Sequence, residues 1–462
     1  MNDDFPRLSS WLSGHTVSSS GVVALVFPAP QVVPTRLVAA YSGNLELSFW
    51  QATPRPDEPS FAIVGFGETI RFEGHGADRT TQVSGRAAEI FASLQQERAP
   101  DAADAPGPFV IGGLSFCPRT EQEPWRAFAD ASFSLPRWTY VRRGERAWWW
   151  LCVHSGARGL DEMTITAEFR ALQEAVRHAQ QMRQSANSST AVARFDVADR
   201  DAYCALVAEA IACIRSRATD KIVAVTSSHV TFREPVDSRL VLERLDAAYP
   251  DTTRFAIQRG DRVFVGASPE RLIARRGKHV DSDGLAGTAR RGADDAVIVQ
   301  RLLSSAKDRR EHALVVDSIA AVLGPRCSTL DVPDEPRVRS LRNVHHLWTP
   351  IRGVLREQLH VLELVAVLHP TPAVSGTPRD RATAWIAEHE PASRGWYTGT
   401  IGYFDAAGDG EFAVAIRAGL VGKTEAFLYA GAGIVEASDP PAEYAETRAK
   451  EAPMLAALGV TP

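Results

Sequence analysis

Short apolar runs alternate with polar, turn-rich connectors over the first part of the chain. GVVALVF, LELSFW and FAIVGFG have the length and composition of strands, and FVIGGLSF and RAWWWLCVH predict two more. Between residues 160 and 184 the apolar positions change to helical spacing. The polar stretch 185–190 then interrupts the pattern, as a surface loop or as a boundary between residues 1–190 and 191–462.

Helices and strands are also grouped in blocks after residue 190. Apolar spacing predicts helices over 200–217, 236–247, 295–323 and 379–390. Strands are predicted for KIVAVTSSHV, for the pair TRFAIQRGDRVFVGAS, and for TGTIGYFDA, EFAVAIRAGLV and AFLYAGAGIV, before a final helix. Because the elements come in blocks rather than in strict alternation, we predict the α+β class with large antiparallel sheets.

The composition is that of an ordinary globular protein, with 45% hydrophobic and 23% charged residues among 462. The net charge of −5 and the lack of a long Lys/Arg run argue against a nucleic-acid-binding protein. No apolar run reaches the length of a transmembrane helix, about 18 residues, so we expect no membrane partner. The N-terminal stretch MNDDFPRLSS lacks the apolar core of a signal peptide.

The cysteines argue against a disulfide framework or a zinc site. Their number is odd, and no two of them form a CxxC pair. A reducing compartment fits this usage better, so we expect a cytoplasmic protein. The five cysteines are Cys117, Cys152, Cys204, Cys213 and Cys327.

Two acidic pairs have the spacing of neighbours on a helix face. In SDPPAEYAETRAKE, Glu443 and Glu446 share a face with Lys450. Asp308 and Glu311 in KDRREHALVVD have the same spacing. Two helices that each offer such a pair suit Mg²⁺, which prefers oxygen ligands and takes one or two carboxylates plus an anionic substrate group. The alternative is that both pairs are solvated helix faces.

Glycines and a lysine near the C-terminal acidic pair also favour a binding site. Gly431 and Gly433 end a predicted strand, where backbone N–H groups could bind an anion; a simple turn is the alternative. Lys450 could pair with a substrate carboxylate or with the glutamates. A bound Mg²⁺ that bridges to a substrate carboxylate would neutralise the acidic cluster.

Lys221 opens the otherwise apolar strand KIVAV. Burial at this position would lower its pKa toward the range of a general base. The alternative is a lysine at the sheet edge that extends its ammonium into water.

Three further polar or charged residues lie in apolar or turn-like stretches and are candidates for catalysis or substrate binding. Glu270 follows the turn in FVGASPE, where a raised pKa would make it a general acid, unless it is a structural partner of Arg271 or Arg394. Arg417 lies within the apolar run VAIRAG and needs an anion, either a side chain or a ligand carboxylate. Tyr397 in RGWYTG could donate to the same carboxylate, or be a core tyrosine.

Taken in order, nine stretches resemble the chorismate-utilising enzyme family, over about residues 195–455. They are KIVAV, GASPERL, GLAGTARRG, KDRREHALVVD, VHHLWTPIRG, LHPTPAVSGTPR, RGWYTGTIGYFD, AIRAGLV and GAGIVEASDPPAEYAETRAKE. The resemblance implies a single α+β chorismate-binding fold with two large packed sheets, peripheral helices and a magnesium site in the cleft. Residues 1–190 resemble the variable N-terminal part of this fold, and residues 191–462 its chorismate-binding catalytic region.

The same resemblance assigns expected roles at the site. Glu311 and Glu446 resemble the magnesium ligands, and Asp308 and Glu443 the positions that support the metal through water. Arg417 and Tyr397 would hold the enolpyruvyl carboxylate of chorismate, and His346 would lie near the ring. The other positions that resemble substrate contacts are Thr288, Gly431, Gly433 and Lys450.

Within the family, Lys221 resembles the general base of the members that add water at ring C2. Glu270 resembles the acid that protonates the departing C4 hydroxyl. HPTPAVSGTPR resembles the isochorismate synthase form more than the aminating form. The resemblance therefore implies a magnesium-dependent isochorismate synthase, an isomerase, that acts as a monomer on chorismate without a glutaminase subunit.

Alternatives remain open at this point. Salicylate synthase shares the first reaction and then expels pyruvate, an aminating synthase would need a glutaminase, and a silent chorismate-binding protein would show no turnover. One departure concerns Thr226, because the related strand usually reads KVVLAR with arginine at this position; the change could alter a contact to Lys221.

Overall fold

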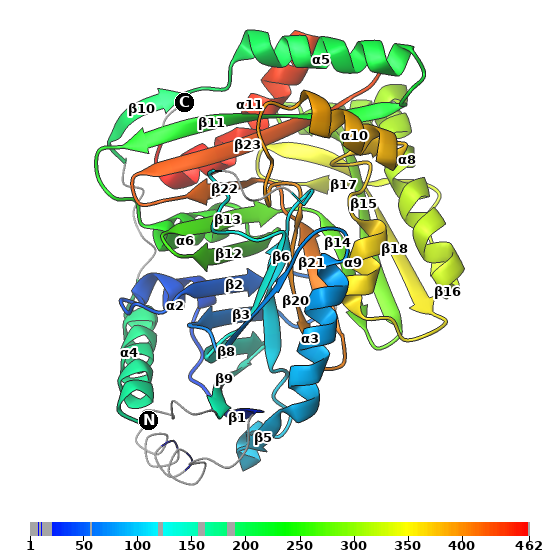
Figure 1. The fold of residues 1–462 in the computed structure, drawn as a ribbon. Coiled ribbons are helices and arrows are strands. Elements are labelled where there is room, and N and C mark those ends of the chain that lie inside the picture. Colours follow the sequence, from blue (N-terminus) through cyan, green and yellow to red (C-terminus); the bar gives the residue numbers. More distant parts are fainter. Residues whose placement is uncertain are drawn as a thin grey trace.

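The computed structural model describes residues 8, 11, 21–55, 58–118, 123–155, 162–182 and 190–460, whose strands form two large sheets (Figure 1). In spatial order, the larger sheet contains β10 (Val192–Asp196), β11 (Lys221–Phe232), β23 (Glu425–Ile434), β22 (Ala418–Val421), β13 (Arg262–Ser268), β12 (Thr253–Arg259), β2 (Leu47–Gln51), β3 (Phe61–Phe66), β8 (Trp138–Arg143), β9 (Arg146–Ser155), β1 (Gly21–Pro28) and β5 (Gln95–Arg98), with β19 (Gly376–Thr377) beside β11. The smaller sheet contains β16 (Cys327–Asp331), β18 (Val344–Leu355), β15 (His279–Arg290), β14 (Arg271–Arg276), β21 (Gly410–Val414), β20 (Thr400–Asp405), β6 (Phe109–Leu114), β7 (Ala131–Leu135) and β4 (Ile70–Gly74), with β17 (Arg337–Ser340) beside β18.

Helices surround the two sheets, which confirms the predicted α+β class. The described strand pairs are antiparallel, apart from the parallel pair β1–β5. The helices are α2 (Pro34–Ala40), α3 (Arg79–Ser93), α4 (Glu162–Gln181), α5 (Arg200–Arg215), α6 (Ser238–Ala248), α7 (Asp295–Ser304), α8 (Ala306–Leu323), α9 (Val361–Leu368), α10 (Arg379–His389) and α11 (Pro440–Leu458).

Strands from both sides of residue 190 take part in both sheets. β2 pairs with β12 in the larger sheet, and β6 pairs with β20 in the smaller one. The boundary between residues 1–190 and 191–462 stays a prediction. Much of the stretch 185–190 on which it rests lies outside the described residues.

The predicted helix over 295–323 is two helices, α7 and α8. Ser305 lies between them in an extended conformation, with φ −68° and ψ 112°. Its side chain accepts a hydrogen bond from the backbone N–H of Asp308 at 3.3 Å, so it caps α8 in place of an intrahelical bond. This break places Asp308 in the first turn of α8.

The predicted strand EFAVAIRAGLV is also divided, and its halves belong to different sheets. β21 lies in the smaller sheet and β22 in the larger one, so the chain crosses between the sheets at residues 415–417. Arg417 has φ 52° at this crossing. It therefore lies where the sheets meet, and the expectation of a mid-strand arginine is wrong.

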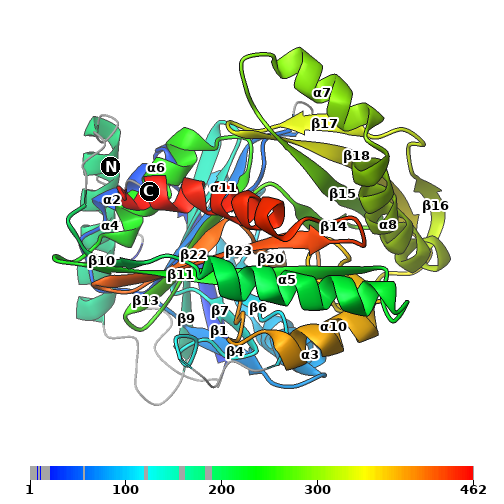
Figure 2. The ribbon, with the colours of Figure 1, turned by 90° about the horizontal axis from the view of Figure 1, so that it is seen from above.

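The two helices that carry the acidic pairs come from opposite sheets. α8 packs against β15 and β18, and α11 packs against β23 (Figure 2). The side chains of Lys307 on α8 and Glu443 on α11 form an ion pair with Nζ–Oε1 at 3.3 Å. The sheets and these two helices thus enclose one space.

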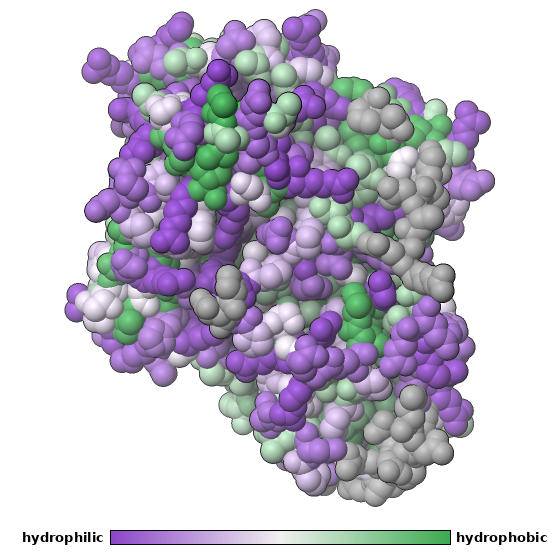
Figure 3. Space-filling view, turned by 180° about the vertical axis from the view of Figure 1, so that it is seen from behind, coloured by the Kyte–Doolittle hydropathy of each residue, from purple (hydrophilic) through white to green (hydrophobic). Residues whose placement is uncertain are grey.

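The surface seen in Figure 3 is mainly hydrophilic, with apolar residues in small groups. Among the described residues, the large apolar side chains that are exposed are Val33, Met163, Val197 and Val297. Among the described helices, none combines the length and the apolar character that crossing a membrane requires.

Candidate active site

Most of the predicted site residues line one cavity where the two sheets meet. The strands β11, β15, β18 and β23, the helices α8 and α11, and the crossing at residues 415–417 contribute to its walls. The predicted residues that line it are Glu270, Thr288, Glu311, His346, Tyr397, Arg417, Gly431, Gly433, Glu446 and Lys450. We refer to it as the substrate cavity.

Lys221 is buried beside this cavity and does not extend into water. Its side chain is 1% exposed, and its Nζ donates to Oε1 of Glu311 at 2.9 Å. A Cβ at Gly433 would lie 2.6 Å from that same oxygen and 2.9 Å from Cε of Lys221. Glycine at 433 therefore leaves the space in which the lysine from β11 meets the glutamate from α8.

On α11, Glu446 is paired with Lys450. The Lys450 Nζ lies 2.6 Å from Oε1 of Glu446 and also donates to the Gly431 carbonyl at 2.9 Å. Burial opposes ionisation of Glu446, but Lys450, with Lys307 and Arg417, more than offsets this effect and lowers the glutamate pKa below its usual value.

Asp308 and Glu443 lie near the cavity without lining it. The pKa of each is raised by burial, and further by negative neighbours: Glu311 and Glu446 for Asp308, and Glu446 for Glu443. The two acidic pairs therefore influence each other electrostatically, although they come from separate helices.

The donor set fits a hard divalent cation that takes part of its ligands from elsewhere. Over the described ranges, no group of three or more His, Cys, Asp or Glu side chains could hold a metal ion. Glu311 and Glu446 nevertheless both line the cavity. One or two carboxylates, with waters and an anionic ligand, are the usual set for Mg²⁺. In this structure lysines neutralise the two glutamates.

Glu270 is 3% exposed at the turn between β13 and β14. Burial raises the pKa of its carboxyl group to about 8, and Asp283 adds to this effect; Lys221, Arg417 and Arg339 partly offset it. At neutral pH the group is therefore protonated and can donate a proton, as the prediction of a general acid requires.

Neither arginine that was considered as a structural partner of Glu270 has that function. Arg271 is paired with Glu411 at 2.9 Å, and Arg394 with Glu390 at 2.5 Å. Glu270 thus has no arginine partner among the described residues.

Arg417, His346 and Thr288 form a chain of polar contacts at the cavity wall. Nη2 of Arg417 lies 3.4 Å from Nε2 of His346, and Nδ1 of His346 lies 3.0 Å from Oγ1 of Thr288. Burial, then Arg417, lowers the His346 pKa well below its usual value, so the imidazole is neutral. A guanidinium only donates, so we assign the proton to Nδ1, which faces Thr288 and the Gly287 carbonyl.

Arg417 has no carboxylate within ion-pair distance among the residues that the structure describes. Tyr397 lies on the same cavity and stacks on Tyr429, with ring centroids 5.3 Å apart. Burial raises the Tyr397 pKa to about 12, so the hydroxyl remains a donor. A half-buried cation and a buried phenol on one cavity favour a ligand anion over a side-chain partner.

Several cavity residues were not predicted. Gly287 and Thr398 have positive φ, 73° and 59°, and Ala373 and Val374 come from the loop before β19. All four lie inside stretches that resemble the family, so the quoted motifs could have identified them. The other unpredicted lining residues are Val223, Pro269, Leu285, Ala286 and Ile416.

Comparisons with known proteins show which proteins this chain is similar to. A family model described as chorismate binding enzyme matches residues 9–459. The salicylate biosynthesis isochorismate synthase of Pseudomonas aeruginosa is 36% identical over 407 residues, which are 87% of this chain and 84% of that protein. The isochorismate synthase MenF of Bacillus subtilis is 36% identical over 434 residues, 91% of this chain and 88% of that protein. The solved structure of the menaquinone-specific isochorismate synthase MenF from Escherichia coli has a TM-score of 0.77 at 26% identity and covers 98% of both chains.

These matches confirm the predicted family, its isochorismate synthase branch and the isomerase class of that branch. The family model spans nearly the whole chain, and the relatives above 30% identity match over most of both lengths. This chain belongs to the chorismate binding enzyme family.

Proposed function

We propose that this chain is a magnesium-dependent isochorismate synthase that converts chorismate into isochorismate. The observation that carries the proposal is a buried lysine from β11 directly beside the cavity and a buried glutamic acid in the lining of that cavity. Lys221 is 1% exposed, and the pKa of Glu270 is about 8. An isomerisation that adds water at one carbon and expels hydroxide from another needs such a base and such an acid.

In the proposed reaction, Lys221 takes a proton from water as its oxygen attacks ring C2. Both conjugated ring double bonds shift, from C1=C2 to C1=C6 and from C5=C6 to C4=C5. The C4–O bond breaks and Glu270 protonates the departing hydroxyl, so one water enters and one leaves. Arg417 and Tyr397 hold the enolpyruvyl carboxylate, and the neutral His346 lies beside them. A magnesium ion held by Glu311 and Glu446 would supply positive charge for the ring carboxylate.

The two lysine–glutamate pairs neutralise the charges of the site when metal and substrate are not bound. Glu311 stabilises the ammonium form of Lys221, because the two are 2.9 Å apart. A cation at Glu311 would take over that carboxylate, which frees the amine to act as a base. In the same way, Lys450 would release Glu446 to the ion and pair with a carboxylate of the substrate. Asp308 and Glu443 would support the ion through bound water.

Incubation of purified protein with chorismate and Mg²⁺, followed by chromatographic separation of the products, tests the proposal. We expect isochorismate, and loss of turnover in EDTA that added Mg²⁺ restores. Salicylate with an equal amount of pyruvate would instead identify a salicylate synthase. Amino-benzoates formed with an ammonium salt would identify an aminating enzyme, and binding without any product would identify a silent protein.

A further inference from the structure

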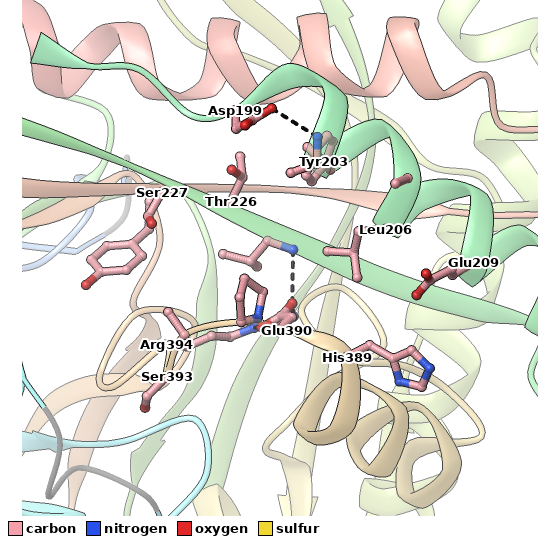
Figure 4. A pocket seen from close by; sticks show the side chains of 16 residues that line it. Asp199, Tyr203, Leu206, Glu209, Thr226, Ser227, His389, Glu390, Ser393 and Arg394 are labelled. Atoms are coloured by element: carbon pink, nitrogen blue, oxygen red, sulfur yellow. Dashed lines mark hydrogen bonds and ion pairs between the residues drawn. The ribbon is translucent and has the colours of Figure 1, made fainter.

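A second cavity lies between α5 and the residues that follow α10 (Figure 4). Its volume is about 380 Å³, within the range of roughly 300–1,000 Å³ that is typical of small-molecule sites. The substrate cavity has only about 70 Å³ free. In Figure 4, Asp199, Leu206 and Glu209 follow α5 on one side of the second cavity, and His389, Glu390 and Arg394 lie on the other.

The second cavity has an apolar interior and acidic groups at its opening. Leu206, Val225 and Tyr429 form part of its walls, whereas Asp199 and Glu209 are exposed at its rim. Within the described part of the chain, the hydrogen bonds of the Asp199 side chain use only Oδ1, which accepts from two backbone N–H groups at 2.9 and 3.0 Å. Its other oxygen remains available to a ligand.

The charges that line this cavity favour a cation. Asp199, Glu209 and Glu390 are acidic, and Arg394 is the only arginine or lysine in the lining. Arg394 is already engaged by Glu390 through two bonds, Nε–Oε2 at 2.7 Å and Nη2–Oε1 at 2.5 Å. The two rim carboxylates therefore keep their charge for a ligand, next to apolar walls that suit a hydrophobic body.

The Glu390–Arg394 pair separates the second cavity from the substrate cavity. Among the described strands, β11 has a neighbour on both sides at Ile222 and at residues 229–231, but between these it pairs only with β23. The pair covers that open edge: Glu390 accepts the Val225 N–H at 3.0 Å, and Arg394 donates to the Val223 carbonyl at 2.7 Å.

Two sets of contacts cross this shared wall. Arg394 donates to the Val374 carbonyl at 2.8 Å and to Oγ1 of Thr398 at 3.3 Å, and both residues line the substrate cavity. Tyr429 of the second cavity stacks on Tyr397 of the substrate cavity. A movement of the wall therefore changes both spaces.

We propose that the second cavity binds a small organic cation, an ammonium or amidinium group on an apolar body, and that its occupancy weakens substrate binding. The substrate cavity has to widen to admit a ring with two carboxylates. The empty second cavity gives the shared wall room to move, and a ligand packed on Val225 and Tyr429 removes that room. The KM for chorismate then rises while kcat changes little. This second effect rests on the proposed function, whereas binding itself does not.

Calorimetry with benzamidine as the probe and benzamide as its neutral counterpart tests the binding. We expect benzamidine to bind about 3- to 10-fold more tightly, because two exposed carboxylates contribute modest energies. Glu209→Gln should reduce this preference. Equal affinity for the two probes, or no binding of benzamidine, would overturn the proposal.

A matched pair of variants on α5 tests the location. Ala202 lines the cavity, and Ala208, on the same helix and also exposed, does not. Ala202→Trp should abolish benzamidine binding, and Ala208→Trp should leave it unchanged. Binding that survives Ala202→Trp would contradict the site.

Steady-state kinetics test the coupling to turnover. Benzamidine should raise the KM for chorismate in the wild type and in Ala208→Trp, but not in Ala202→Trp, whose own KM should already be raised. Inhibition that persists in Ala202→Trp would place the probe in the substrate cavity and overturn the coupling, as would binding without any change in KM. A protein without chorismate turnover would refute the proposed function and leave the binding measurement valid.

Discussion

Two arginines buried in the sheets have carboxylate partners, whereas two ionisable residues at the substrate cavity have no ion-pair partner in the described part of the chain. In the larger sheet, Arg254 is fully buried and paired with Asp246 at 3.0 Å, and in the smaller sheet Arg271 is paired with Glu411 at 2.9 Å. At the cavity, Glu270 is buried and Arg417 is half-buried, yet neither has an ion-pair partner among the described residues.

This difference separates charges that hold the fold together from charges that are kept for a ligand. A buried charge without a partner destabilises a protein, so it persists where function requires it. Glu270 avoids part of that cost because it is protonated, with a pKa of about 8. Substitutions at the cavity should therefore lower mainly the turnover, and substitutions in the structural pairs should lower mainly the free energy of unfolding.

Lys221→Ala is the strongest test on the cavity side. We expect turnover of chorismate to fall by about 10³-fold or more, since a positioned base contributes roughly 10²- to 10⁴-fold. The far-UV circular dichroism spectrum should remain close to wild type. The melting temperature should fall, because Glu311 loses its buried partner, so turnover is compared per folded molecule. Near wild-type turnover would show that this lysine is not the base.

Glu270→Gln should lower kcat by about 10²- to 10³-fold with little change in KM, because a proton donor acts in the transition state. The matched comparison is Glu411→Gln, which removes a carboxylate from a structural pair nearby. That variant should lose stability and keep most of its kcat per folded molecule. A large rise in KM for Glu270→Gln, with kcat unchanged, would contradict the role of an acid.

Glu446→Gln should lower activity on the order of 10²-fold and shift the magnesium dependence to higher concentration. Titration of activity with Mg²⁺ after EDTA treatment measures both effects. Glu436, an acidic residue outside the cavity lining, provides the control variant Glu436→Gln. Activity in EDTA equal to that of the magnesium-loaded wild type would refute the metal assignment.

On the structural side, Arg254→Met should lower the free energy of unfolding by about 3 kcal/mol, because it leaves Asp246 without its buried partner. Urea denaturation measures this change. The double variant Arg254→Met/Asp246→Asn should recover part of the loss. The kcat/KM of the folded fraction should stay within about 2-fold of wild type; a larger loss would mean that this pair also shapes the cavity.

The sequence predicted which residues gather at the cavity better than it predicted how the chain brings them there. Ordered motifs identified Glu311, Glu446 and Arg417, and apolar spacing identified most of the elements in residues 191–462. The apolar run around Arg417 did not reveal that its two halves pair with different sheets, because strand pairing depends on distant segments. Helix α3 was not predicted; only Val83 and Ala87 on it are buried, so its apolar positions give a weak helical pattern.

Charge partners were the least predictable feature. The sequence left Arg394 open as a partner of Glu270. In the fold Arg394 forms an ion pair with Glu390 and covers the open edge of β11. A lone arginine in an apolar context has the same local sequence whether it forms a structural pair or faces a ligand. Only the tertiary arrangement distinguishes Arg394 from Arg417.

A pH dependence of stability and activity should arise from Glu270 alone. Its pKa rises from 4.5 in a model peptide to about 8 in the folded protein, so the folded state retains a proton that the unfolded state loses between these values. This contribution to stability is fully present below pH 4.5 and is lost as pH rises through 8. The kcat/KM should fall above pH 8 for the same reason, because the acid form disappears.

Urea denaturation of wild type and Glu270→Gln between pH 5 and 9 isolates this contribution. The difference in unfolding free energy between the two proteins should change steadily with pH up to about pH 8, with wild type losing stability relative to the variant, and then level off. The paired carboxylate Glu411 should produce no comparable slope in Glu411→Gln. A pH-independent difference for Glu270→Gln would mean that Glu270 is ionised in the folded protein, and the contrast between paired and unpaired buried charges would then fail at its central residue.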